Sequence, residues 1–75
     1  MDRAILLERL AQAERHVAGG VQQIARQRTV IANLERHGHD TNQARGLLAQ
    51  FQSTQALHIA DRDRLKKELE ARGKR

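Results

Sequence analysis

Residues 35–41 read Glu35-Arg36-His37-Gly38-His39-Asp40-Thr41 and divide the sequence into two halves of similar length. Gly38 suits the left-handed conformation just past a helix end, and the cationic Arg36 favours a helix C-terminus. Asp40 can cap a following helix, and Gln43, three residues later, completes a capping box. A stop signal so close to a start signal predicts a tight turn between two antiparallel helices.

The halves on either side of this turn both repeat at helical spacing. Apolar residues lie seven apart from Leu10 to Ile31, and the positions from Ala44 to Leu65 repeat in the same way. Further apolar residues fill the intervening third or fourth places, so each helix carries one apolar stripe. We expect the two stripes to meet in a seam formed by Leu6, Leu10, Val17, Ile24, Ile31, Leu47, Phe51, His58, Leu65 and Leu69.

The pattern therefore predicts an all-α fold, an antiparallel two-helix hairpin with coiled-coil-like packing. The hairpin forms a single domain over residues 1–75, with a helix over 2–36, a turn over 37–40 and a helix over 41–72. Each helix would be about 50 Å long at 1.5 Å per residue. The pattern leaves two choices open. Either Leu47 or Leu48 can occupy one seam position, and either Thr54 or Gln55 can occupy another.

Two adjacent glycines, Gly19 and Gly20, lie in the middle of the first helix. A glycine inside a helix costs about 1 kcal/mol relative to alanine, so one interpretation is a break that divides the chain into three helices over 2–18, 21–36 and 41–72. However, the seven-residue series from Leu10 to Ile31 crosses the glycines without losing register. We therefore expect a continuous helix that uses Gly20 for a close approach to the second helix.

The composition excludes several classes of protein. A chain of 75 residues has room for one small domain, and without Cys it has neither disulfides nor thiolate zinc sites. No stretch is apolar enough for a membrane span, and the first ten residues contain no signal-peptide apolar run. The single Phe leaves almost no aromatic surface for stacking bases or entering a membrane. We expect a cytoplasmic protein that does not associate with membranes.

The supply of apolar side chains predicts self-association. A single core in a chain of this size rarely contributes more than about 3–5 kcal/mol, and this chain has no disulfide or metal to add to it. The apolar set is also wider than one seam needs, since Leu57 and Ile59 flank His58 on both sides. A second copy would bury this excess in a dyad-symmetric four-helix bundle. The alternative is a monomeric hairpin with some exposed Leu and Ile.

The sequence predicts no enzyme, cofactor or metal site. Ser53 is the only serine, and no Gly-rich phosphate loop is present. His37, His39 and Asp40 are close in sequence, but the turn itself accounts for such residues, and zinc needs three or four ligands. His16 and His58 would approach each other across the hairpin, where a hydrogen-bonded seam residue is the commoner role.

The charge distribution supports two hypotheses about function. Fourteen Lys and Arg against nine Asp and Glu give a net charge of +5. The first hypothesis is a non-enzymatic interaction and oligomerisation module, which binds itself and an unidentified protein partner through a charged outer surface. The alternative is a small basic nucleic-acid-binding regulator. Its candidate contacts would be Arg15, Arg26, Arg28, Arg36 and Arg45.

A resemblance to known proteins is carried by four segments: Ala13-Glu14-Arg15-His16-Val17, Ile24-Ala25-Arg26-Gln27-Arg28, Leu34-Glu35-Arg36-His37-Gly38-His39-Asp40-Thr41 and Gln55-Ala56-Leu57-His58-Ile59-Ala60-Asp61-Arg62-Asp63-Arg64-Leu65. They resemble a group of short bacterial helical-hairpin proteins of unassigned function. The resemblance implies a cytoplasmic bacterial helical protein, and it supplies no activity to carry over to this chain. The expected topology is also similar to that of the repressor-of-primer protein, a hairpin that dimerises into a four-helix bundle and binds RNA, although no motif is shared.

Overall fold

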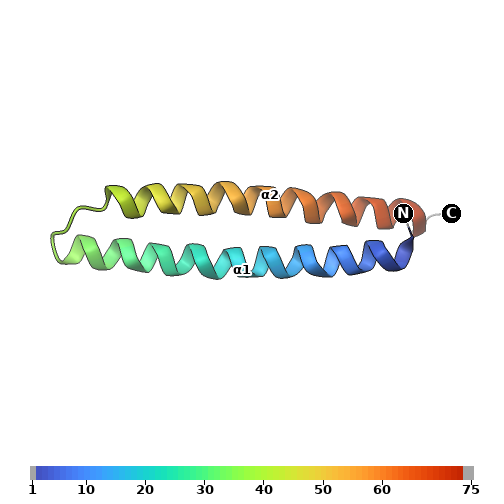
Figure 1. Cartoon of the computed structure of the whole chain (residues 1–75), viewed down its shortest axis with the longest axis horizontal. Coiled ribbons are helices and arrows are strands. Elements are labelled where there is room, and N and C mark those ends of the chain that lie inside the picture. Colours follow the sequence, from blue (N-terminus) through green and yellow to red (C-terminus); the bar gives the residue numbers. More distant parts are fainter. Residues whose placement is uncertain (1, 74–75) are drawn as a thin grey trace.

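The computed structural model describes residues 2–73, which form two long α-helices joined by a short turn (Figure 1). Helix α1 spans Arg3–Arg36 and helix α2 spans Asn42–Gly73. The helices lie antiparallel along their whole length in a rod of 59 × 15 × 14 Å, with the start of α1 and the end of α2 at the end opposite the turn. The all-α hairpin predicted from the sequence is confirmed, and both helix starts lie one residue later than expected.

The turn is built on Gly38, whose φ of +72° places it in the left-handed region. The backbone N–H of His39 donates to the carbonyl of Leu34 at 2.9 Å, and that of Gly38 donates to Glu35 at 3.1 Å. This pair of bonds is a Schellman motif, which satisfies the last carbonyls of α1. The prediction that Gly38 is the left-handed residue after a helix end is confirmed.

The start of α2 differs from the predicted capping box. The Oδ1 of Asp40 accepts the backbone N–H of Asn42 at 2.9 Å, and no hydrogen bond among residues 2–73 joins Asp40 to Gln43. The reason is a shift of one residue: α2 begins at Asn42, so Thr41 stands immediately before the helix and Asp40 lies one residue too early to reach the third helical residue.

The residues that face the opposite helix follow an unbroken heptad rule. In α1, all buried and half-buried residues lie on one series whose steps alternate between three and four residues. The buried and half-buried residues from Thr41 through α2 follow the same rule. In α1 the series is Leu6, Leu10, Ala13, Val17, Gly20, Ile24, Gln27, Ile31 and Leu34. In α2 it is Thr41, Ala44, Leu48, Phe51, Gln55, His58, Arg62, Leu65 and Leu69. This spacing keeps both series facing one another over eight turns, as in a coiled coil.

Leu47 does not belong to the seam, contrary to the sequence prediction. Its side chain is 41% exposed, while its neighbour Leu48 is half-buried and takes the inward position. Successive residues of a helix point about 100° apart, so only one of two adjacent leucines can occupy the seam. The step from Leu48 to Phe51 continues the heptad series, whereas a start at Leu47 would break it.

Helix α1 is continuous through Gly19 and Gly20. A Cβ built on Gly20 would come within 1.9 Å of Oε1 and 2.6 Å of Cδ of Gln55, whereas one on Gly19 would meet no atom within 4 Å. Gly20 therefore lets the amide of Gln55 lie directly against the α1 backbone. Gly19 faces open space and has no such packing role.

The buried core is small and lies toward the open end of the hairpin. Leu6, Ala13 and Leu65 are buried together, and the half-buried Leu10 and Leu69 pack against them. Ile31, near the turn, is the remaining buried apolar residue of the described chain. In residues 2–73, neither helix has a stretch apolar enough to cross a membrane.

Candidate interaction surface

The middle of the seam is polar. Gln55 is only 7% exposed, and its Nε2 donates to the backbone carbonyl of Val17 at 2.8 Å. That carbonyl belongs to the α1 backbone beside Gly20, which has no side chain to keep the amide away. The Oε1 of Gln55 has no hydrogen-bond partner among the described residues. The contact is directional, so it specifies how the two helices are aligned.

His16 and His58 meet across the hairpin next to this amide, as expected from the sequence. Their ring centroids are 4.9 Å apart and the rings are tilted by 44°. Both imidazoles line a hollow of about 290 Å³ on one side of the hairpin, together with Arg15 and Arg26. Gly19 and Gly20 also line it; the α1 backbone is open at Gly19, whereas the Gln55 amide lies over Gly20.

The five arginines proposed as anion contacts do not form one surface. Arg15 and Arg26 share the hollow just described, whereas Arg28 lines a different hollow with Val21, Ile24, Ala25 and Gln55. Arg36 donates a hydrogen bond to Asn33, and Arg45 forms an ion pair with Glu35 that links α2 to α1. Only two of the five are therefore brought together without a carboxylate partner in residues 2–73.

Two of the basic residues toward the end of α2 have acidic partners. Arg62 pairs with Asp63 at 3.1 Å, and Arg64 pairs with Asp61. The hydrogen bond to Asp61 raises the pKa of the Arg64 guanidinium, so this exposed group stays cationic at all ordinary pH values. These pairs interleave the two signs of charge at this end of α2.

Large apolar side chains are exposed along the whole hairpin. Val21 and Leu57 are the most open, with 59% and 72% of their surface exposed. The full set is Ile5, Leu7, Val21, Val30, Leu47, Leu57 and Ile59. Only three large apolar residues of the described chain, Leu6, Ile31 and Leu65, are buried, so the hairpin exposes more large apolar side chains than it buries.

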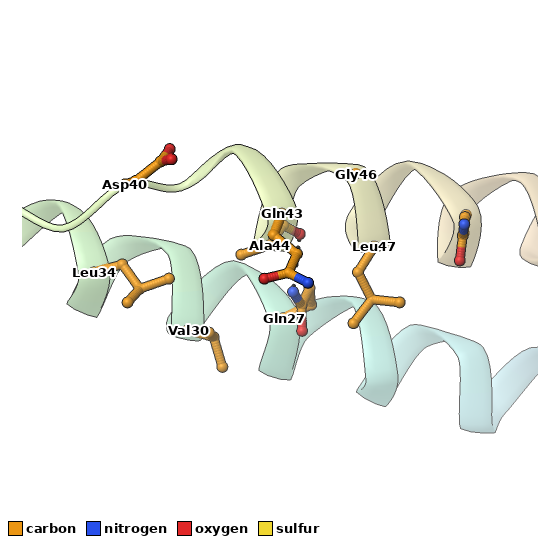
Figure 2. A pocket seen from close by; sticks show the side chains of 9 residues that line it. Gln27, Val30, Leu34, Asp40, Gln43, Ala44, Gly46 and Leu47 are labelled. Carbon is orange, nitrogen blue, oxygen red and sulfur yellow. Dashed lines mark hydrogen bonds between the residues drawn. The ribbon is translucent and has the colours of Figure 1, made fainter.

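Some of the exposed apolar residues border a groove near the turn. Figure 2 shows this groove, which has a volume of about 800 Å³ and lies between Val30 and Leu34 of α1 and Leu47 of α2. At its centre the Nε2 of Gln27 donates to the backbone carbonyl of Ala44 at 2.9 Å. The groove is wide and shallow, without a cluster of titratable side chains, which suits contact with another chain better than enclosure of a small molecule.

The residues predicted for the seam lie at different depths. Leu6, Ile31 and Leu65 are buried, Leu47 is exposed, and the other members, Leu10, Val17, Ile24, Phe51, His58 and Leu69, are half-buried. The structure adds polar residues that counting apolar side chains does not find, namely Gln27 and Arg62. Continuing the alternating steps of three and four across both helices would have located them.

The turn brings two histidines near one another without forming a metal site. The rings of His37 and His39 have centroids 6.5 Å apart, and the Nδ1 of His37 lies 2.7 Å from the carbonyl of Asn33. Among residues 2–73, no group of three His, Cys, Asp or Glu side chains could hold a metal ion. The histidines of the turn therefore have local contacts and no shared ligand geometry.

Comparisons with protein-family models, with curated proteins and with solved structures each found no match to this chain. The resemblance to short bacterial helical-hairpin proteins consequently stays a prediction. Function has to be argued from the surfaces of the hairpin itself.

Proposed function

We propose that this chain is a non-enzymatic interaction module of the cytoplasm, which associates with itself as a four-helix bundle and binds a protein partner through its charged outer surface. The observation that supports the proposal best is that residues 2–73 expose seven large apolar side chains and bury only three. A soluble monomer rarely leaves so large a share of its apolar residues in water, and exposed apolar surface commonly marks an interface.

The polar features of the hairpin also favour an interaction role. The Gln55 contact and the Glu35–Arg45 ion pair align the two helices, so the outer side chains have defined positions. A rigid helical surface that presents interleaved charges suits recognition of a complementary protein surface.

The oligomeric part of the proposal is tested by sedimentation equilibrium. The dimer should have twice the 8.5 kDa mass of the chain at tens of micromolar. Thermal unfolding followed by circular dichroism should shift to higher temperature as protein concentration rises, because association stabilises the folded state by mass action. A mass of one chain together with melting that does not depend on concentration would refute self-association.

Partner binding is tested by a native pull-down with the tagged protein, with and without nuclease. We expect one captured protein that survives nuclease treatment and is released by high salt. The control is a variant with Arg15 and Arg26 both changed to Glu, which alters the outer charge and leaves the seam intact. Capture that is lost with nuclease would instead support the second candidate function.

That second candidate is nucleic-acid binding, and one observation favours it. Arg15 and Arg26 line a single hollow with His16 and His58, beside α1 backbone that is uncovered at Gly19. Such a cationic hollow can accept a phosphate group. Affinity for nucleic acid would then fall steeply with salt and would be lost in the same double Arg→Glu variant. A chain that retains no nucleic acid at about 50 mM salt would exclude this function.

A further inference from the structure

Helix α1 carries a second stripe directly beside the seam. Each of its residues follows a seam residue, so the stripe is rotated by about 100° around the helix. We call it the outer stripe; its members are Leu7, Ala11, Glu14, Ala18, Val21, Ala25, Arg28, Ala32 and Glu35. All of them are exposed, and alanine recurs at every seventh residue. In a four-helix bundle each helix contacts two neighbouring helices through two adjacent faces. Helix α1 has two such faces: the seam, which contacts α2, and the outer stripe, which would contact a second copy.

The outer stripe contains a hollow with the geometry of a coiled-coil hole. Val21, Ile24, Ala25 and Arg28 line a mostly apolar hollow of about 500 Å³, and Gln55 from α2 completes its wall. The four α1 residues are spaced i, i+3, i+4 and i+7. Four residues with this spacing form the diamond that receives one side chain, the knob, from a facing helix. Gln55 is almost fully buried and forms the α2 side of this wall.

From this geometry we infer that the hollow receives Val21 of a second copy of the chain, with the two α1 helices antiparallel about a two-fold axis. The inference rests on the proposed self-association and names its surface. By symmetry, Val21 of each copy enters the hole of the other and lies opposite Ala25. In the same register Ala18 lies opposite Arg28, and Glu14 opposite Ala32. Apart from Leu7, which falls opposite the turn, each larger side chain of the outer stripe therefore faces an alanine, which allows the helices to approach closely.

Charge favours the antiparallel direction. In this register Glu14 of each copy lies opposite Ala32 of the other, one helical turn from Arg28. Two intermolecular ion pairs can therefore form, one on each side of the two-fold axis. Neither residue forms an ion pair within residues 2–73 of its own chain, whereas Glu35 is already paired with Arg45. A parallel arrangement would bring Glu14 against Glu14 and Arg28 against Arg28, and like charges at an interface are unfavourable.

The hole is tested by sedimentation equilibrium of two matched variants. Val21→Lys places a charge in the hole and should raise the dissociation constant of the dimer at least 30-fold, equivalent to about 2 kcal/mol. Leu57→Lys makes the same change at a residue that is more exposed but lies outside the outer stripe, and should leave the constant within about 3-fold of wild type. Circular dichroism of both variants checks that the helices remain formed.

The charge pairs are tested by reversal. Glu14→Arg and Arg28→Glu should each weaken the dimer by about tenfold or more, because each creates like-charge contacts. The double variant with both changes should recover wild-type association, since the pairs form again with opposite polarity. Recovery within a factor of about three supports the antiparallel contact, and two additive losses overturn it.

The register is tested by cross-linking, because the chain has no native cysteine. With the axis between Val21 and Ala25, Ala25→Cys places two thiols near each other and should be linked by a short bismaleimide. The thiols of Ala18→Cys would be ten residues, or about 15 Å, apart along the axis and should not be linked. This interface is overturned if the Ala18→Cys variant is linked and the Ala25→Cys variant is not. It is also overturned if Val21→Lys leaves the dissociation constant of the dimer unchanged. Either result leaves the proposed self-association standing. A monomeric wild-type chain overturns both.

Discussion

Gly19→Ala should stabilise the protein and Gly20→Ala should not, although the two residues are adjacent in one helix. At Gly19 the new methyl group would meet no atom within 4 Å. The helix then gains its propensity difference, about 1 kcal/mol, without a steric penalty. For a domain of this size, a gain of 1 kcal/mol raises the melting temperature by about 4–8 °C.

At Gly20 the same methyl group would lie 1.9 Å from the Gln55 Oε1, so the amide must move. Movement breaks the 2.8 Å hydrogen bond from Gln55 Nε2 to the Val17 carbonyl and leaves buried polar groups without partners. That loss is about 1–3 kcal/mol and offsets the gain in helix propensity. Gly20→Ala should therefore be neutral to about 2 kcal/mol destabilising, and less stable than Gly19→Ala by about 1–3 kcal/mol.

A double-mutant cycle with Gln55→Ala tests the cause. Once the amide is removed, Gly20→Ala should stabilise the protein by about 1 kcal/mol, as Gly19→Ala does in the wild type. All variants are melted at one protein concentration, followed by circular dichroism, because self-association would shift the midpoint. If Gly20→Ala is as stabilising as Gly19→Ala in the wild-type background, the close approach described here is wrong.

Three further predictions concern the core and the turn, and chemical denaturation measures each. Leu65→Ala should destabilise the hairpin by about 2–5 kcal/mol because Leu65 is buried. The same change at the exposed Leu57 should alter the free energy of unfolding by no more than about 0.5 kcal/mol. Equal effects would show that the core is misplaced. Phe51→Ala should cost about 2 kcal/mol, less than a fully buried Phe, since Phe51 is half-buried; a neutral result would remove it from the seam. Gly38→Ala should destabilise the hairpin by about 1 kcal/mol because the φ of Gly38 is positive. Gly46→Ala should stabilise it by a similar amount, because a Cβ at Gly46 would meet open space. The reverse order of stability would contradict the turn geometry.

The sequence was sufficient to predict the hairpin because two independent signals agree. The apolar series crosses Gly19 and Gly20 in register, and Gly38 combines with the flanking charges to mark a single turn. The choice between Leu47 and Leu48 could not be made by spacing from apolar neighbours alone. It depends on Gln55, His58 and Arg62, which continue the heptad with polar side chains.

The interaction surface was harder to predict than the fold. The five arginines look alike in the sequence, but each one's surroundings depend on which side of the hairpin it faces and on whether an acid on the other helix can reach it. Arg45 meets Glu35 only because the turn folds back, and Arg15 shares a hollow with Arg26 because the glycines between them leave space. Which side chains meet depends on the rotation of each helix about its own axis. The order of residues in the sequence indicates this rotation only indirectly.

The start of α1 and the end of α2 lie together at one end of the rod, away from the turn (Figure 1). In the antiparallel dimer inferred above, this placement has a mechanical consequence. Arg3 lies 20 residues from the two-fold axis, so the corresponding ends of the two copies would be held about 60 Å apart. Fluorophores attached at the two starts of α1 should then report a long, fixed separation. The assembly would act as a stiff spacer, holding whatever is joined to one copy at a set distance from its counterpart on the other.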